Sequence, residues 1–80
     1  MIIEIYSRPG CHLCDEAKKT LLDAAPRFPF QLVEINVEDN PQWEAEHGQD
    51  IPVVFINGRK AFKHRVSTAA LVRYLSKIRE

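Results

Sequence analysis

The sequence predicts an α/β fold whose elements follow the order β-α-β-α-β-β-α. A β-rich apolar run at 2–6 is followed by a segment with apolar residues at helical spacing. Residues 30–37 alternate between apolar and polar side chains, which is typical of a strand. Asn57-Gly58, a strong hairpin signal, joins the apolar run 51–56 to a returning segment. Strands that alternate with helices in this way indicate a sheet with parallel pairs.

The first strand and the first helix meet at residues 7–10. The strand is almost continuously apolar, so we expect it to be buried on both faces. The helix begins near Cys11, and Pro26 and Pro29 end it. Its apolar face is formed by Leu13, Ala17, Leu21 and Ala24.

The second half of the chain carries clear boundary signals. Asn40 is expected to cap a short helix that begins at Pro41 and is stopped by Gly48. Trp43 is expected to anchor this helix to the core, with docking of a partner as the alternative. The returning strand is predicted over 59–66. Ser67 or Thr68 then caps a last helix, whose apolar positions are Leu71, Tyr74, Leu75 and Ile78.

Composition limits the classes of function. The chain has 80 residues, of which 45% are hydrophobic and 28% charged, with zero formal net charge. These values predict a single domain over 1–80, which we expect to be a monomer, and they give no electrostatic attraction to nucleic acid or anionic membranes. No apolar run approaches the roughly 20 residues of a membrane span. Because the N-terminus has no basic region before an apolar one, we expect no signal peptide and a cytoplasmic location.

Both cysteines, Cys11 and Cys14, lie where the first strand gives way to the first helix. A helix start presents unpaired N–H groups and about half a unit of positive charge, which favours a thiolate. This end effect lowers a thiol pKa by roughly one unit. Such a pair is catalytic or metal-binding in a reducing compartment. Structural zinc requires four ligands, and the histidines are scattered, so we expect no metal site.

Two segments resemble the glutaredoxin branch of the thioredoxin fold. Residues 6–14, YSRPGCHLC, are similar to the glutaredoxin active-site signature, with basic Arg8 three positions before the first cysteine. Residues 51–58, IPVVFING, are similar to the family's segment around a proline. The resemblance covers nearly the whole chain. It implies a thioredoxin-like fold, a four-stranded mixed sheet with helices on both faces.

The resemblance also implies a thiol–disulfide oxidoreductase. Cys11 is then the attacking thiolate and Cys14 the resolving thiol, and together they form a redox-active disulfide. Pro52 is expected to be cis and to face the cysteines, and Ile51 to offer its backbone N–H and C=O to an extended thiol peptide. Expected substrates are disulfide-containing proteins and glutathione mixed disulfides.

Glutathione is the expected co-substrate, with no bound cofactor. The sequence departs from the glutathione-binding pattern at His12 and Leu13, where the family has proline and tyrosine. It departs again at 63–68, which lacks the family's Gly-Gly pair and acidic residue. Ser67 and Thr68, at a helix start, are expected to bind a carboxylate instead. Two alternatives follow: a redoxin reduced by thioredoxin reductase, and a carrier of a [2Fe–2S] cluster between two protomers.

Several basic and imidazole side chains leave two interpretations open. Arg8 and His12 either stabilise the thiolate or face solvent with modest effect. His47 and His64 are expected at the surface. A basic run protects an edge strand or attracts glutathione carboxylates or an acidic partner; it consists of Arg59, Lys60, Lys63, His64 and Arg65.

Overall fold

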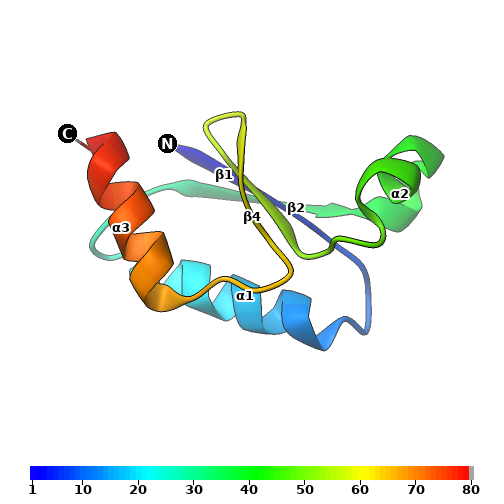
Figure 1. The fold of residues 1–80 in the computed structure, drawn as a ribbon, viewed down its shortest axis with the longest axis horizontal. Helices are drawn as coiled ribbons and strands as arrows, with labels where there is room; N and C mark the ends of the chain where they lie inside the picture. The colour runs from blue at the N-terminus through cyan, green and yellow to red at the C-terminus, as the bar shows by residue number, and fades with distance from the viewer. Residues whose placement is uncertain (80) are drawn as a thin grey trace.

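Four strands form one mixed sheet in the order β2-β1-β3-β4 (Figure 1). The computed structural model describes residues 1–79, so Glu80, the end of the predicted domain, lies outside them. The strands are β1 (Ile2–Ser7), β2 (Gln31–Asn36), β3 (Val53–Ile56) and β4 (Arg59–Lys63). β1 pairs with β2 in parallel and with β3 antiparallel, and β3 and β4 form the predicted hairpin. The four-stranded mixed sheet is therefore confirmed.

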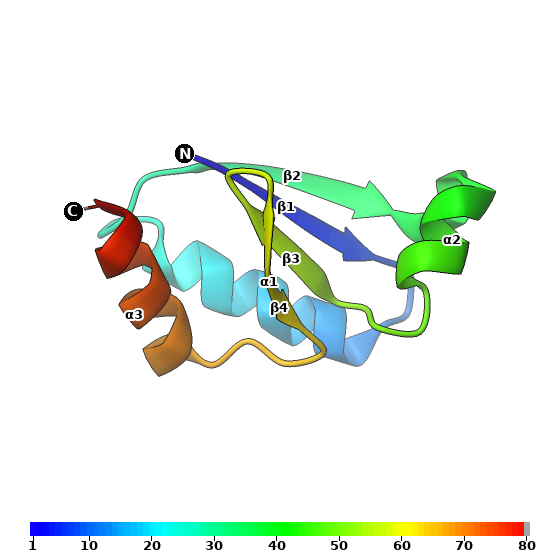
Figure 2. The ribbon, with the colours of Figure 1, turned by 45° about the horizontal axis from the view of Figure 1, so that its top comes forward.

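The helices follow the predicted order. They are α1 (His12–Ala24), a 3-10 turn η1 (Val37–Asp39), α2 (Pro41–His47) and α3 (Thr68–Arg79). α1 and α3 lie on one side of the sheet, and α2 lies near the ends of β1 and β2 (Figure 2). Within residues 1–79, no helix has the length and hydropathy that a membrane crossing requires.

The main core lies between the sheet and the pair α1 and α3. Ile3 and Ile5 of β1 point into it, as do Val54 and Ile56 of β3, because alternate residues of a strand share a face. Both helices contribute buried leucines, and the fully buried ones are Leu21, Leu71 and Leu75. The helical periodicity thus predicted the core-facing side of α1 and α3 correctly, except for Ile78, which is 39% exposed.

A second, smaller cluster lies on the other face of the sheet. Tyr6 is offset by one residue from Ile5, so its ring points away from the main core and contacts the His47 ring at 4.5 Å. Trp43 and Phe55 complete the cluster, with centroids 6.2 and 5.5 Å from that of Tyr6. α2 therefore covers this face, which confirms helices on both faces. Trp43 anchors α2 as predicted, but to this face and not to the main core.

The expectation that His47 lies at the surface was wrong. Its side chain is 12% exposed, and its Nδ1 atom is buried with no hydrogen-bond partner among the described residues. Burial, together with the charges of Glu4 and Glu46, raises the pKa of the neighbouring Tyr6. A seven-residue helix has too few turns for periodicity to show which face is buried, so the burial of His47 could not be predicted from the local pattern.

Three strands differ from the prediction, β1 in its burial and β3 and β4 in their boundaries. β1 is not buried on both faces: Ile2 is 48% exposed because α2 covers the opposite end of this face. β3 begins at Val53 instead of residue 51, since Pro52 has no N–H to donate to a ladder. β4 ends at Lys63 instead of residue 66, because His64 turns the chain with a positive φ of 66°.

The predicted caps and turn are confirmed. Asn40 Oδ1 accepts a hydrogen bond from the Gln42 N–H at 2.9 Å, ahead of Pro41. Asn57 and Gly58 both have positive φ, as a two-residue hairpin turn requires. Of the two candidate caps of α3, Ser67 fills the role, because its Oγ accepts from the Ala70 N–H at 3.1 Å.

Candidate active site

Cys11 and Cys14 form a disulfide at the N-terminus of α1. Cys11 is the N-cap residue, and its Sγ accepts a hydrogen bond from the Cys14 N–H at 3.2 Å. Cys14 is 3% exposed, whereas Cys11 is half-buried. The sulfur that a second molecule can reach is therefore that of Cys11, and it already receives one helix-start N–H group.

The turn before Cys11 is shaped by Gly10. Its φ of +78° is a left-handed conformation that favours glycine. The Cys11 N–H then donates to the Arg8 carbonyl at 3.3 Å, which closes the turn. The end of β1, this turn and α1 thus hold Cys11 at the helix start.

The guanidinium of Arg8 points toward α2. Its Nη2 donates to Glu44 Oε1 at 2.5 Å and to the Gly48 carbonyl at 3.0 Å, and its side chain is 32% exposed. The guanidinium is therefore paired with a carboxylate and ties the turn before Cys11 to the C-terminal end of α2.

The Ile51–Pro52 peptide bond is cis, as the resemblance implied. Because Tyr6 pairs with Val53 in the β1–β3 ladder, this loop lies at the same end of the sheet as the turn before Cys11. The His64 N–H donates to the Pro52 carbonyl at 2.8 Å and to the Asp50 carbonyl at 3.2 Å. Within residues 1–79, the main-chain N–H and C=O of Ile51 have no hydrogen-bond partner.

The two residues between the cysteines lie in different surroundings. The His12 side chain is 86% exposed, with its Nε2 3.6 Å from Glu16 Oε1. Leu13 is half-buried. The structure therefore places His12 in solvent beside a carboxylate on its own helix, and Leu13 against the protein.

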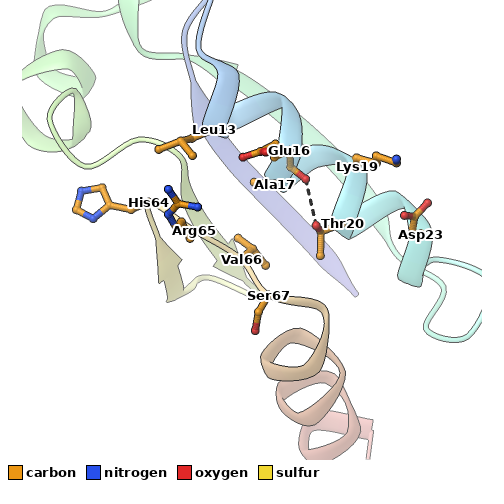
Figure 3. A pocket seen from close by; sticks show the side chains of 10 residues that line it. All are labelled: Leu13, Glu16, Ala17, Lys19, Thr20, Asp23, His64, Arg65, Val66 and Ser67. Carbon is orange, nitrogen blue, oxygen red and sulfur yellow. Dashed lines mark hydrogen bonds between the residues drawn. The ribbon is translucent and has the colours of Figure 1, made fainter.

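A groove of about 510 Å³ begins at Leu13 and runs between α1 and the segment 64–67 (Figure 3). We call it the α1 groove. Leu13 and Ser67 are the predicted site residues that line it. The other predicted site residues are not among its lining residues: Arg8, Cys11, His12, Cys14, Ile51, Pro52 and Thr68. Its other lining residues are Glu16, Ala17, Lys19, Thr20, Asp23, His64, Arg65 and Val66.

Sequence reasoning missed the α1 side of this groove. Positions 13, 16, 17, 20 and 23 follow the spacing of one helix face, but most of them are polar, as on any solvated face. Residues 64–67 were assigned partly to a strand. The described residues 1–79 contain no group of three or more His, Cys, Asp or Glu side chains placed to hold a metal ion.

Comparisons with known proteins show the family to which this chain belongs. Residues 2–76 match the family model Glutaredoxin-like domain (DUF836). A glutaredoxin-like protein YDR286C homolog from Dictyostelium discoideum is 34% identical over 70 residues, which are 80% of this chain and 65% of that protein. The chain thus spans less than two thirds of that relative. A thioredoxin from Methanocaldococcus jannaschii is 33% identical over 78 residues, 94% of this chain and 92% of that protein.

Solved structures of other proteins superpose on this fold. The protein XcR50 from X. campestris superposes with a TM-score of 0.81 at 25% identity, covering 94% of this chain and 96% of that one. Thioredoxin 1 from Thermosipho africanus has a TM-score of 0.64 at 20% identity over the full length of both chains, and shows the shared fold. A cysteine pair at a helix start in this fold is a redox-type site. The chain belongs to the glutaredoxin-like domain family, with the thioredoxin fold.

Proposed function

We propose that this protein is a thiol–disulfide oxidoreductase that reduces disulfides through Cys11 and Cys14. The observation that carries the proposal is the asymmetry of the pair. Cys11 is accessible and accepts a helix-start N–H, while Cys14 is buried behind it. An accessible stabilised thiolate suits attack, and a buried thiol within one helical turn suits resolution.

The reaction transfers two electrons from the protein to the substrate. The Cys11 thiolate attacks one sulfur of a substrate disulfide, forms a mixed disulfide and expels the other sulfur as a thiolate, which takes a proton from water. Cys14 then loses its proton and attacks the Cys11 sulfur. This step expels the second substrate thiolate and leaves the Cys11–Cys14 disulfide, the form present in the structure.

Trapping tests the assigned roles. In a Cys14→Ser variant the mixed disulfide has no resolving thiol, so we expect mass spectrometry to find a stable adduct on Cys11 after exposure to a disulfide substrate. The matched Cys11→Ser variant should form no adduct, because Cys14 is buried. An adduct on Cys14 in that control, or none on Cys11, would contradict the assignment.

The electron donor is the second part of the proposal. Glutathione and a thioredoxin-type reductase are both chemically suited to reduce the pair. Two observations favour the reductase: Arg8 is already paired with Glu44, and His64-Arg65 fills the stretch where glutaredoxins have two glycines. In addition, the match to the thioredoxin relative covers 94% of this chain, whereas the match to the glutaredoxin-like relative covers 80%.

A coupled assay separates the donors. Oxidation of NADPH is followed once with glutathione and glutathione reductase and once with thioredoxin reductase. We expect faster turnover with thioredoxin reductase, and faster turnover with glutathione would reverse the assignment. The alternative of a [2Fe–2S] carrier stays a prediction, which visible absorbance of anaerobically purified protein tests.

A further inference from the structure

Arg8 carries the charge of the turn that holds Cys11. The Cys11 N–H donates to the Arg8 carbonyl, and residues that close a turn in this way have Cα atoms less than about 7 Å apart. An arginine side chain spans about the same distance, so the guanidinium is long enough to reach the Cys11 sulfur. The structure places it instead against the C-terminal end of α2.

The end of α2 offers the guanidinium two acceptors at once. Arg8 Nη2 donates to Glu44 Oε1 at 2.5 Å and to the Gly48 carbonyl at 3.0 Å. That carbonyl belongs to the C-terminal end of the helix, which carries a partial negative charge. The side chains of Arg8 and Glu44 are 32% and 42% exposed, so solvent screens the ion pair only in part.

Gly48 leaves the space that the Glu44 carboxylate fills. The carboxylate lies over the end of its own helix, because a Cβ atom on residue 48 would lie 2.5 Å from Glu44 Oε1 and 2.9 Å from Glu44 Cδ. A larger residue at this position would therefore push the carboxylate away from Arg8. The two residues are four positions apart, about one helical turn, so this turn supplies both the acceptor and the room for it.

Reduction of the disulfide creates a competing acceptor. The disulfide sulfur of Cys11 carries no charge, whereas the Cys11 thiolate is an anion that attracts a guanidinium. This sulfur already receives the Cys14 N–H at the helix start. A guanidinium is held best where it donates to a carboxylate and a second acceptor together, which is what Glu44 and Gly48 provide.

We propose that Glu44 is a positioning residue of the redox site, which keeps the Arg8 guanidinium on α2 and away from the Cys11 thiolate of the reduced protein. This inference rests on the proposed dithiol function. The helix start then stabilises the thiolate, and Arg8 contributes little. Because stabilising the reduced form makes a dithiol pair a weaker reductant, this placement keeps Cys11 and Cys14 suited to reducing substrate disulfides.

Titration of the thiolate tests the proposal. In the Cys14→Ser background Cys11 is the one remaining cysteine, and the backbone N–H of residue 14 is retained. Ultraviolet absorbance follows thiolate formation as the pH is raised. Glu44→Ala releases the guanidinium, so we expect the midpoint to fall by about half a pH unit, which is about threefold in thiolate concentration below the midpoint.

Glu46→Ala is the matched control for Glu44→Ala. It removes the same charge from the same helix, but the Glu46 carboxylate accepts a hydrogen bond from Gln42 and none from Arg8. We expect it to leave the midpoint within about 0.2 pH unit of the parent value.

Arg8→Gln separates movement of the guanidinium from the loss of a carboxylate. With Glu44 present, it should change the midpoint by less than about 0.2 pH unit, because the guanidinium is held on α2. In the Glu44→Ala background it should raise the midpoint by about half a pH unit. The other charged or titratable groups around the site are the same in every variant: His12, Asp15, Glu16, Asp50, His64 and Arg65.

Two results would overturn the inference: an unchanged midpoint in Glu44→Ala, or an effect of Arg8→Gln that is the same with and without Glu44. Failure of the dithiol function is a separate result, because Cys11 titrates whether or not it forms an adduct with a disulfide substrate. Circular dichroism verifies that each variant is folded. If Glu44→Ala is unfolded, Glu44→Gln decides. It keeps the shape without the charge, so the midpoint should fall by a smaller amount, and an unchanged midpoint counts against the proposal.

Discussion

The contacts of Arg8 lead to a quantitative prediction about stability. Replacing Arg8 with alanine removes a charged hydrogen bond to Glu44 and a second bond to the Gly48 carbonyl. A hydrogen bond to a charged group is worth about 1.5–3 kcal/mol when sheltered, whereas exposed ion pairs contribute about 0.2–1 kcal/mol. With side chains 32% and 42% exposed, the Arg8–Glu44 pair falls toward the lower range. With the bond to the Gly48 carbonyl included, we expect Arg8→Ala to lower the free energy of unfolding by about 1.5–2 kcal/mol.

This loss of stability is measured by urea unfolding of the parent protein, the variants Arg8→Ala and Glu44→Ala, and the double variant, which together form a double-mutant cycle. Glu44→Ala should cost less than Arg8→Ala, since Arg8 keeps its bond to Gly48, and the coupling energy of the pair should be about 0.5–1 kcal/mol. Arg8→Lys should recover part of the loss, because one ammonium cannot hold both acceptors in the same geometry. The reasoning is refuted if Arg8→Ala lies within about 0.3 kcal/mol of the parent protein or the coupling is zero.

Three further predictions concern α2 and its surroundings. His47→Phe should raise the free energy of unfolding, measured by urea denaturation, by about 1 kcal/mol, because it removes the buried Nδ1. A lower free energy of unfolding in this variant would contradict the prediction and indicate that Nδ1 is hydrogen-bonded. Gly48→Ala should lower thermal stability by about 1 kcal/mol or more, since a Cβ there would lie 2.5 Å from the Glu44 carbonyl oxygen, and an unchanged melting temperature would contradict this. The raised pKa of Tyr6 means that its stabilising contribution is complete below pH 10, and that stability falls as pH rises through the higher folded value. Tyr6→Phe should therefore lose less stability above pH 10 than the parent protein, and equal losses would rule out this linkage.

Much of the fold could be predicted because local signals and tertiary structure agree. Asn40 before Pro41 and the pair Asn57-Gly58 are short-range signals whose backbone geometry the structure reproduces. The helical spacing on α1 and α3 identified their buried leucines. The cysteine pair was placed at a helix start from the change in periodicity alone, and the structure has it there.

What sequence reasoning missed depends on long-range contacts. Arg8 was assigned to the thiolate or to solvent, but Glu44 is 36 residues away along the chain. His47 is buried because a short helix happens to lie over Tyr6 and Phe55, which no local pattern encodes. The α1 groove needs the turn at His64 to bring 64–67 opposite α1, and a positive φ at histidine is uncommon.

Cys11 and Cys14 are three positions apart and both lie at the start of α1, so their disulfide joins two parts of the same helix end. So short a loop restricts the unfolded chain less than a long-range bridge does. A difference in unfolding free energy between the two redox states therefore arises mainly in the folded protein, from the groups that contact the cysteines. By a thermodynamic cycle, this difference equals the amount by which the fold shifts the potential of the pair, and the Cys14 N–H that donates to Cys11 is one of the groups that set it. Core mutations would change how much folded protein a cell retains, and the driving force for electron transfer would stay the same.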